Sequence, residues 1–256
     1  MLLFPSALSV AVTLHAVSAS RVQLHARART VTCQAGGSPA RILAYGDSLT
    51  AGTFKMDAPD ELYPYAPHLE AALKGAAIVR HRGLPGWTAQ AMLNSVDDAD
   101  RGLRGILKKA GINPPVDLAI VLAGTNDIGC YTDADGIIAA LVGLHSAAHE
   151  LGVRTLAVGI PPSAFLARDE PAATTAAEVN ERMQAWCQRQ PNALAGFEPH
   201  PVRAYEPDGG LWSRDGLHLS PEGYRVTGEG LVAAVRRRLE ESSVGSSARG
   251  GRNIIY

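Results

Sequence analysis

The sequence is poor in cysteine and in aromatic side chains, and its charges almost cancel. None of its three cysteines, Cys33, Cys130 and Cys187, lies in a CxxC pair or at metal-ligand spacing. We therefore expect no metal site, and we interpret Cys130 and Cys187 as buried free thiols, with pairing in an oxidising compartment as the alternative. Phe, Trp and Tyr make up only 5% of the residues and the net charge is −1. Both observations argue against nucleic acid as a partner.

Acidic residues are absent from the first 46 positions, which contain four arginines. The apolar run from Met1 to Leu14 is shorter than the about 20 residues that span a bilayer. Small residues follow it at Val17-Ser18-Ala19, and the next stretch is rich in Arg, Ser and Thr, as in organelle transit peptides. We expect residues 1–38 to be a targeting or disordered segment. If the segment is a targeting signal, we expect it to direct the protein to an organelle such as a plastid or mitochondrion, or to secretion.

Long apolar runs are also absent from the rest of the chain, so we expect no transmembrane segment. Hydrophobic residues make up 46% and charged residues 19% of the 256 residues, which is the composition of a globular protein. This length suits one α/β domain, which we place at residues 39–240. The last residues, 241–256, are rich in Ser, Gly and Arg and are predicted to form a disordered tail.

Short apolar runs that predict strands alternate with longer segments of helical spacing. Strands are expected at residues 41–45, 76–80, 117–122, 153–160 and 193–197, and helices at 67–74, 88–93, 97–110, 133–151, 172–190 and 221–239. Strands joined by helix-length connections form mainly parallel sheets with helices on both faces, so the predicted fold class is α/β. Ligands of such sheets bind at the carboxyl ends of the strands.

Three candidate site residues each follow a predicted strand. Ser48 comes after the first strand, Gly86 after the second and Asn126 after the third. Because the carboxyl ends of parallel strands share one edge of the sheet, we expect these residues to converge there. Asp47 and Asp127 lie beside two of them, and we interpret both as structural residues that hold loops by hydrogen bonds to backbone amides.

The converging residues supply a nucleophile and oxyanion donors. The hydroxyl of Ser48 needs a base to become nucleophilic, and the alternative is a serine that caps the next helix. The backbone N–H groups of Ser48 and Gly86 and the side-chain amide of Asn126 can stabilise an oxyanion. Taken alone, Gly86 would be a turn residue before a helix capped by Thr88, and Asn126 a routine loop residue.

The base is found near the other end of the chain. Asp215 lies three residues before His218, so the acid can orient the imidazole and stabilise its protonated form. The histidines at 145 and 149 share a helix face by their spacing and could hold a metal. Glu150 follows them instead of standing between them, so there is no HExxH motif, and we interpret this pair as a solvated face.

Four motifs in this order resemble the GDSL family of esterases and lipases, in the SGNH hydrolase superfamily. They are GDSLTAG at 46–52, the glycine of PGWT at 85–88, GTND at 124–127 and DGLH at 215–218. The resemblance implies a three-layer α/β/α, flavodoxin-like fold without metal or organic cofactor. It makes Ser48 the nucleophile, His218 the base and Asp215 its partner, with Ser48, Gly86 and Asn126 as oxyanion donors. Gly83 is the alternative glycine donor, because Arg82-Gly83-Leu84-Pro85 stands where the family often has Asn or Ser.

The predicted function is hydrolysis of small soluble carboxylic esters through an acyl-enzyme, with activity that falls as the imidazole is protonated at low pH. Residues 53–65 could form one wall of an acyl pocket, with Trp87, Phe165 and Trp212 as further candidates. Two other classes remain open. One is a flavodoxin-like module that binds a nucleotide or phosphate at Gly46-Asp47-Ser48. The other is a binding module that has lost turnover.

Overall fold

The computed structural model describes residues 38–55, 61–109 and 116–247. The targeting prediction for the N-terminal segment falls on residues outside these ranges. Within them, no helix is both long and apolar enough to cross a membrane.

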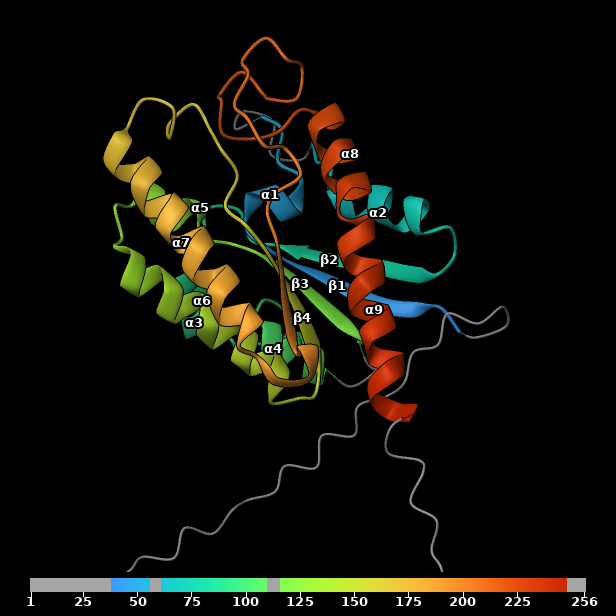
Figure 1. The fold of residues 1–256 in the computed structure, drawn as a ribbon. Coiled ribbons are helices and arrows are strands. Elements are labelled where there is room, and N and C mark those ends of the chain that lie inside the picture. Colours follow the sequence, from blue (N-terminus) through green and yellow to red (C-terminus); the bar gives the residue numbers. More distant parts are fainter. Residues whose placement is uncertain (1–37, 56–60, 110–115, 248–256) are drawn as a thin grey trace, which may run out of the picture.

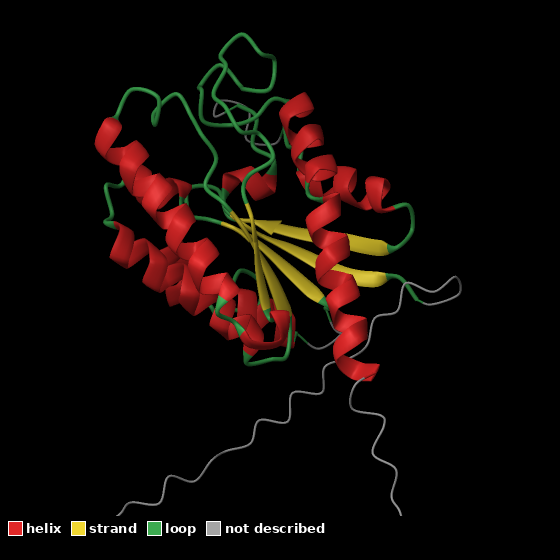
Figure 2. Ribbon diagram, viewed as in Figure 1, coloured by secondary structure: helices red, strands yellow, loops and turns green. Residues whose placement is uncertain are grey.

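A five-stranded sheet, parallel throughout, forms the middle layer of the fold (Figure 2). Its strands lie in the order β2 (Ala77–Gly83), β1 (Ala40–Gly46), β3 (Leu118–Leu122), β4 (Arg154–Val158) and β5 (Ala195–Glu198). Gly46 pairs with Gly83 on one side and with Leu122 on the other, so β1, β2 and β3 end at the same level. The prediction of a parallel sheet from alternating strand and helix patterns is therefore confirmed.

Helices cover both faces of the sheet, which gives the three-layer α/β/α arrangement (Figure 1). One face packs against α3 (Ala89–Asn94), α4 (Leu103–Lys108), α6 (Ala134–His149) and α7 (Glu170–Gln188), and the other against α2 (Tyr65–Leu73), α8 (Pro221–Gly230) and α9 (Val232–Ser247). Two short helices, α1 (Ser48–Ala51) and α5 (Thr125–Gly129), follow β1 and β3, and a 3₁₀ turn at Pro191–Ala193 precedes β5. Two apolar cores result, one on each face.

Side-chain caps explain where several helices begin. The predicted cap Asp133 accepts a hydrogen bond from the backbone amide of Gly136 at the start of α6. Thr88 caps α3 in the same way through the amide of Ala91. At α8 the cap is Ser220, and Pro221 occupies the first turn, where its missing N–H costs nothing.

Two predicted helices differ from the structure. In place of one helix over 97–110 there is a turn followed by the short α4, because the Asp98 carboxylate binds the backbone amides of Asp100 and Arg101. Such local side-chain bonds compete with helix formation. The predicted closing helix is divided into α8 and α9 at Leu231, and α9 continues to Ser247. The first part of the predicted disordered tail is therefore helical.

Candidate active site

Ser48 is the first residue of α1, two residues after the end of β1, which lies next to the central strand β3. Asp47, not Ser48, caps this helix, because its Oδ1 accepts a hydrogen bond of 2.9 Å from the Leu49 amide. The turn passes very close to β3: a Cβ on Gly46 would lie 1.9 Å from the carbonyl oxygen of Leu122. Only glycine fits at this point, and the tight turn places the serine at the carboxyl edge of the sheet.

The structure brings the predicted nucleophile and the predicted base together. His218 Nε2 lies 2.9 Å from Ser48 Oγ, although the two residues are 170 positions apart in the sequence. The other imidazole nitrogen, Nδ1, lies 2.7 Å from Asp215 Oδ2. Ser48 and His218 are only 7% and 2% exposed, so the chain of hydrogen bonds is largely shielded from water. A base at this distance is what a serine hydroxyl needs in order to act as a nucleophile.

The carboxylate of Asp215 is held in place by its own loop. Its Oδ1 accepts hydrogen bonds of 2.9 Å from the amides of Leu217 and His218. Burial acts to raise the pKa of Asp215, but the hydrogen bonds from the His218 imidazole and from these two amides outweigh it and leave the pKa below its ordinary value. The acid is thus kept charged, as a partner of an imidazolium needs to be.

The two other acids near the site behave in the opposite way. Burial raises the pKa of Asp47 to about 7, and it also raises the pKa of Asp127. Both make the backbone hydrogen bonds expected of structural residues, since Asp127 Oδ2 accepts 2.8 Å from the Ala89 amide and Asp47 caps α1. Of the three acids, only Asp215 has its pKa lowered.

The predicted oxyanion donors surround the same edge. Gly86 lies in an exposed turn at φ +78°, where a Cβ would meet no atom within 4 Å. At Gly83, the alternative donor, a Cβ would lie 2.1 Å from the Ala51 backbone nitrogen, so this glycine serves close packing against α1. Close packing thus accounts for the glycine at position 83, and Gly86 remains the predicted donor.

Hydrogen bonds fix the loop that carries Gly86 at both ends. The Leu84 amide donates 2.8 Å to the Gly46 carbonyl oxygen, which ties the loop to the nucleophile turn. Asn126 Nδ2 donates 2.9 Å to the Trp87 carbonyl oxygen. An amide NH₂ has two hydrogens, so Asn126 retains a second N–H for a ligand.

The candidate walls of an acyl pocket do not all reach the surface. Tyr65 and Trp212 are 0% and 7% exposed and belong to the core, so they are not available to a substrate. Phe54 and Tyr63 pack edge to face with ring centroids 5.7 Å apart, while Phe165 packs in the same way against Tyr131. Phe165 and Trp87 are partly buried, and the prediction for residue 56 lies outside the described residues.

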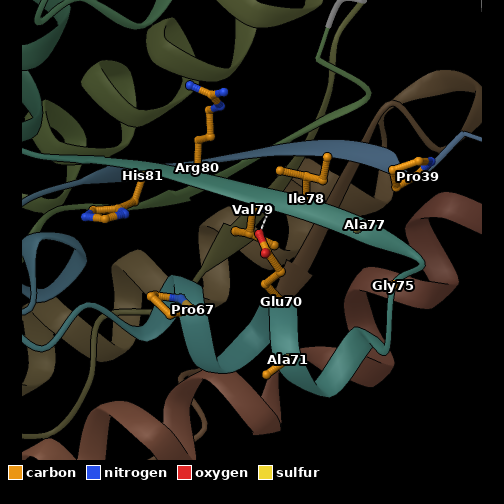
Figure 3. A pocket seen from close by; sticks show the side chains of 10 residues that line it. All are labelled: Pro39, Pro67, Glu70, Ala71, Gly75, Ala77, Ile78, Val79, Arg80 and His81. Atoms are coloured by element: carbon orange, nitrogen blue, oxygen red, sulfur yellow. Dashed lines mark hydrogen bonds between the residues drawn. The ribbon is translucent and has the colours of Figure 1, made fainter.

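A large open cavity lies elsewhere, between α2 and the edge strand β2 (Figure 3). Its volume is about 840 Å³, and none of the predicted site residues lines it. Within it, Glu70 Oε2 accepts a hydrogen bond of 2.6 Å from the Val79 amide, which satisfies a backbone donor that an edge strand would otherwise expose.

The predicted solvated histidine pair packs against the protein instead, with His145 buried and His149 half-buried. Nδ1 of His145 and Nε2 of His149 lie 2.7 and 2.9 Å from the hydroxyl oxygen of Thr155, and both rings pack against Trp186. Burial lowers the pKa of His145 to about 3 and that of His149 to about 4, so both are neutral at pH 7. In the described part of the chain, no three His, Cys, Asp or Glu side chains gather as a metal site would require.

Cys130 and Cys187 are both free in the structure. Cys187 is buried as predicted, and burial raises the pKa of its thiol to about 12. Cys130 is exposed, so the prediction of a buried thiol is wrong at this position. It lies at the end of α5, where its amide donates hydrogen bonds to the carbonyl oxygens of Asn126 and Asp127.

Residues 44–226 match the GDSL-like lipase/acylhydrolase family. This match covers well over half of the chain, so the protein belongs to that family and is a hydrolase of ester bonds. The family resemblance seen in the four motifs is therefore confirmed. A comparison with curated proteins finds no match.

Solved structures share the fold. A carbohydrate acetylesterase family member from Sinorhizobium meliloti has a TM-score of 0.61 at 25% identity, covering 78% of this chain and 99% of its own. A lipolytic protein of the G-D-S-L family from Veillonella parvula has a TM-score of 0.59 at 18% identity, covering 77% and 99%. A carbohydrate esterase family 3 protein from Talaromyces cellulolyticus has a TM-score of 0.56 at 17% identity, covering 79% and 99%. The predicted three-layer fold is confirmed.

Proposed function

We propose that the protein hydrolyses small carboxylic esters by a two-step acyl-enzyme mechanism. The observation that carries this proposal is the continuous chain of hydrogen bonds from Ser48 Oγ through the His218 imidazole to Asp215. A nucleotide- or phosphate-binding module would need none of these contacts.

In the first step Ser48 Oγ attacks the ester carbonyl carbon while its proton passes to His218 Nε2. The negative charge on the carbonyl oxygen is stabilised by the Ser48 and Gly86 amides and by the Asn126 side chain. The carbon–oxygen bond to the alcohol then breaks, and His218 returns the proton to the departing oxygen. Water next attacks the acyl-enzyme, with its proton taken by His218, and releases the acid and the free serine.

The proposed substrates are small acyl or acetyl esters. The Sinorhizobium meliloti protein, named as a carbohydrate acetylesterase family member, supports this choice at 25% identity. We expect p-nitrophenyl acetate to be hydrolysed with a higher kcat/KM than p-nitrophenyl decanoate. A preference for the decanoate would overturn the proposed substrate size while leaving the mechanism in place.

Covalent labelling tests the mechanism itself. The full-length protein and its Ser48→Ala variant are incubated with a fluorophosphonate, and the adduct is located by peptide mass. Ser163→Ala is the matched control, because Ser163 is buried to a similar degree, at 5% exposure, and its hydroxyl oxygen accepts a hydrogen bond of 3.2 Å from the Leu166 amide instead of contacting a histidine. We expect label on Ser48 in wild type and in the control, and none in Ser48→Ala. A folded wild-type protein without label would refute an activated serine and favour a binding module.

A further inference from the structure

A single buried tyrosine connects the two segments that carry Ser48 and His218. Tyr224, on α8, is 0% exposed, and its hydroxyl donates a hydrogen bond of 2.5 Å to the carbonyl oxygen of Thr53. At the start of α8, the backbone amide of Tyr224 donates a hydrogen bond of 3.0 Å to the carbonyl oxygen of Ser220, which lies two residues after His218. Tyr224 therefore contacts both segments, one through its hydroxyl group and the other through its backbone.

Each of these two segments is joined by backbone hydrogen bonds to a member of the catalytic pair. The Thr53 amide donates 3.0 Å to the Ser48 carbonyl oxygen, so Thr53 closes the helical turn that Ser48 begins. Ser220 lies two residues after His218, and the Ser213 amide donates 2.8 Å to the His218 carbonyl oxygen next to the bridge between Trp212 and Leu219. A displacement of either segment relative to Tyr224 would move the serine or the imidazole by a similar amount.

Close packing on both sides holds the tyrosine itself. A Cβ on Gly228 would lie 2.5 Å from the carbonyl oxygen of Tyr65, so α8 packs directly on the backbone of α2. At the other end of α8, a Cβ on Gly223 would lie 2.2 Å from the Leu211 carbonyl oxygen. The phenol is thus carried by a helix that has little freedom to shift, and its hydroxyl bond to Thr53 holds the Ser48 segment at a fixed position relative to the start of α8.

We propose that Tyr224 is a positioning residue whose hydroxyl sets the distance between Ser48 Oγ and His218 Nε2. This inference rests on the proposed function for its kinetic consequences. Proton transfer from Ser48 requires hydrogen-bond contact, which the 2.9 Å separation provides. A misplacement of about 1 Å in such a site lowers the rate about 100-fold. Tyr224 touches no reacting atom and acts only through the two loops.

The test is the Tyr224→Phe variant of the full chain, with Tyr45→Phe as matched control. Tyr45 is also 0% exposed, and its hydroxyl also donates to a backbone carbonyl, that of Arg101 at 2.9 Å. Each variant loses one buried hydroxyl group and one hydrogen bond, but the segment around Arg101 carries no site residue. The two are expected to show similar losses in Tm, which matches them for stability.

For hydrolysis of p-nitrophenyl acetate we expect Tyr224→Phe to lower kcat by about 10-fold to 100-fold with little change in KM. Fluorophosphonate labelling of Ser48 should slow by a similar factor, while Tyr45→Phe stays within about twofold of wild type in both assays. Equal kcat values for the two variants would overturn the proposal, because Tyr224 would then contribute only stability.

Crystal structures of wild type and Tyr224→Phe test the positioning role without an activity measurement. We expect the Ser48 Oγ to His218 Nε2 distance to exceed hydrogen-bond range in the variant alone. An unchanged distance refutes the positioning role. If wild type neither hydrolyses esters nor takes up the label, the proposed function fails, and the two structures still decide whether Tyr224 holds the loops.

Discussion

Replacing Asp47 by Asn should change the pH dependence of stability in a way that only this residue explains. The Asp47 carboxyl is 0% exposed, and its Oδ2 has no hydrogen-bond partner among the described residues. Burial raises its pKa from 3.8 to about 7, against the lowering effect of the Leu49 amide and with a further increase from the charge of Asp127.

The direction in which stability changes with pH follows from the protons that the folded and unfolded states bind. Because the folded-state pKa is the higher one, the native protein holds this proton between about pH 4 and pH 7 while the unfolded chain releases it. The resulting stabilisation is complete below the unfolded-state pKa and is lost as the pH rises through the folded-state pKa. A difference of about three pKa units corresponds to about 4 kcal/mol. Asn is neutral at every pH and caps a helix as well as Asp does.

We therefore expect the free energy of unfolding of Asp47→Asn, minus that of wild type, to rise by up to about 4 kcal/mol between about pH 4 and pH 8. Urea unfolding of both proteins across this range measures the difference. The contributions of the other titrating groups cancel in it when the substitution leaves those groups unperturbed. A difference that does not vary with pH would refute the reasoning, since the carboxyl would then have an ordinary pKa. A difference that falls with pH would show a stabilised carboxylate.

Three further outcomes follow from the structure. Asp215→Asn should lower kcat about 10³-fold to 10⁴-fold with little change in Tm, and a kcat within tenfold of wild type would remove this acid from the mechanism. Gly216→Ala should lower the free energy of unfolding by about 1–3 kcal/mol more than Gly210→Ala does. Both glycines have positive φ, but only at Gly216 would the new Cβ meet another atom, the Ala164 Cβ at 2.4 Å. Equal melting temperatures of the two variants would contradict this. Since burial lowers the pKa of His145 to about 3, wild type should lose up to about 1.4 kcal/mol per pH unit more than His145→Gln on acidification below about pH 6.5. Parallel stability curves for the last pair would refute it.

The edge of the sheet where the site lies could be predicted because a parallel sheet leaves little choice. The apolar run at 117–122 has the length and composition of a buried strand, and it forms β3 in the middle of the sheet. Once three strands are parallel, the residues that follow them converge, and this places Ser48, Gly86 and Asn126 together without knowledge of any contact. Asp215 and His218 were predictable for a chemical reason, since a serine nucleophile needs a base and an acid to orient it.

The histidines of α6 were beyond such reasoning. The spacing of His145 and His149 identifies a shared helix face but not the element that this face meets. In the structure α7 brings Trp186 against both rings, and β4 supplies the Thr155 hydroxyl. A polar residue on a helix resembles a solvated one in sequence whenever its partners come from other elements, so burial of this kind depends on tertiary packing.

The proposed role of Tyr224 was also beyond prediction from the sequence. Its sequence context, a tyrosine in the first turns of an amphipathic helix, is that of an ordinary core residue, and its ring does fill the core. What distinguishes it is the hydroxyl bond to Thr53, 171 residues away in the chain, and such a bond leaves no local pattern. The reacting residues can be predicted from the sequence because their chemistry is known. A residue that only positions them can be recognised only in the structure, from the hydrogen-bond partner of its buried hydroxyl group. In this fold that hydrogen bond leads from α8 to the Ser48 turn through Thr53, and the first residues of α8 follow directly on the loop that carries His218.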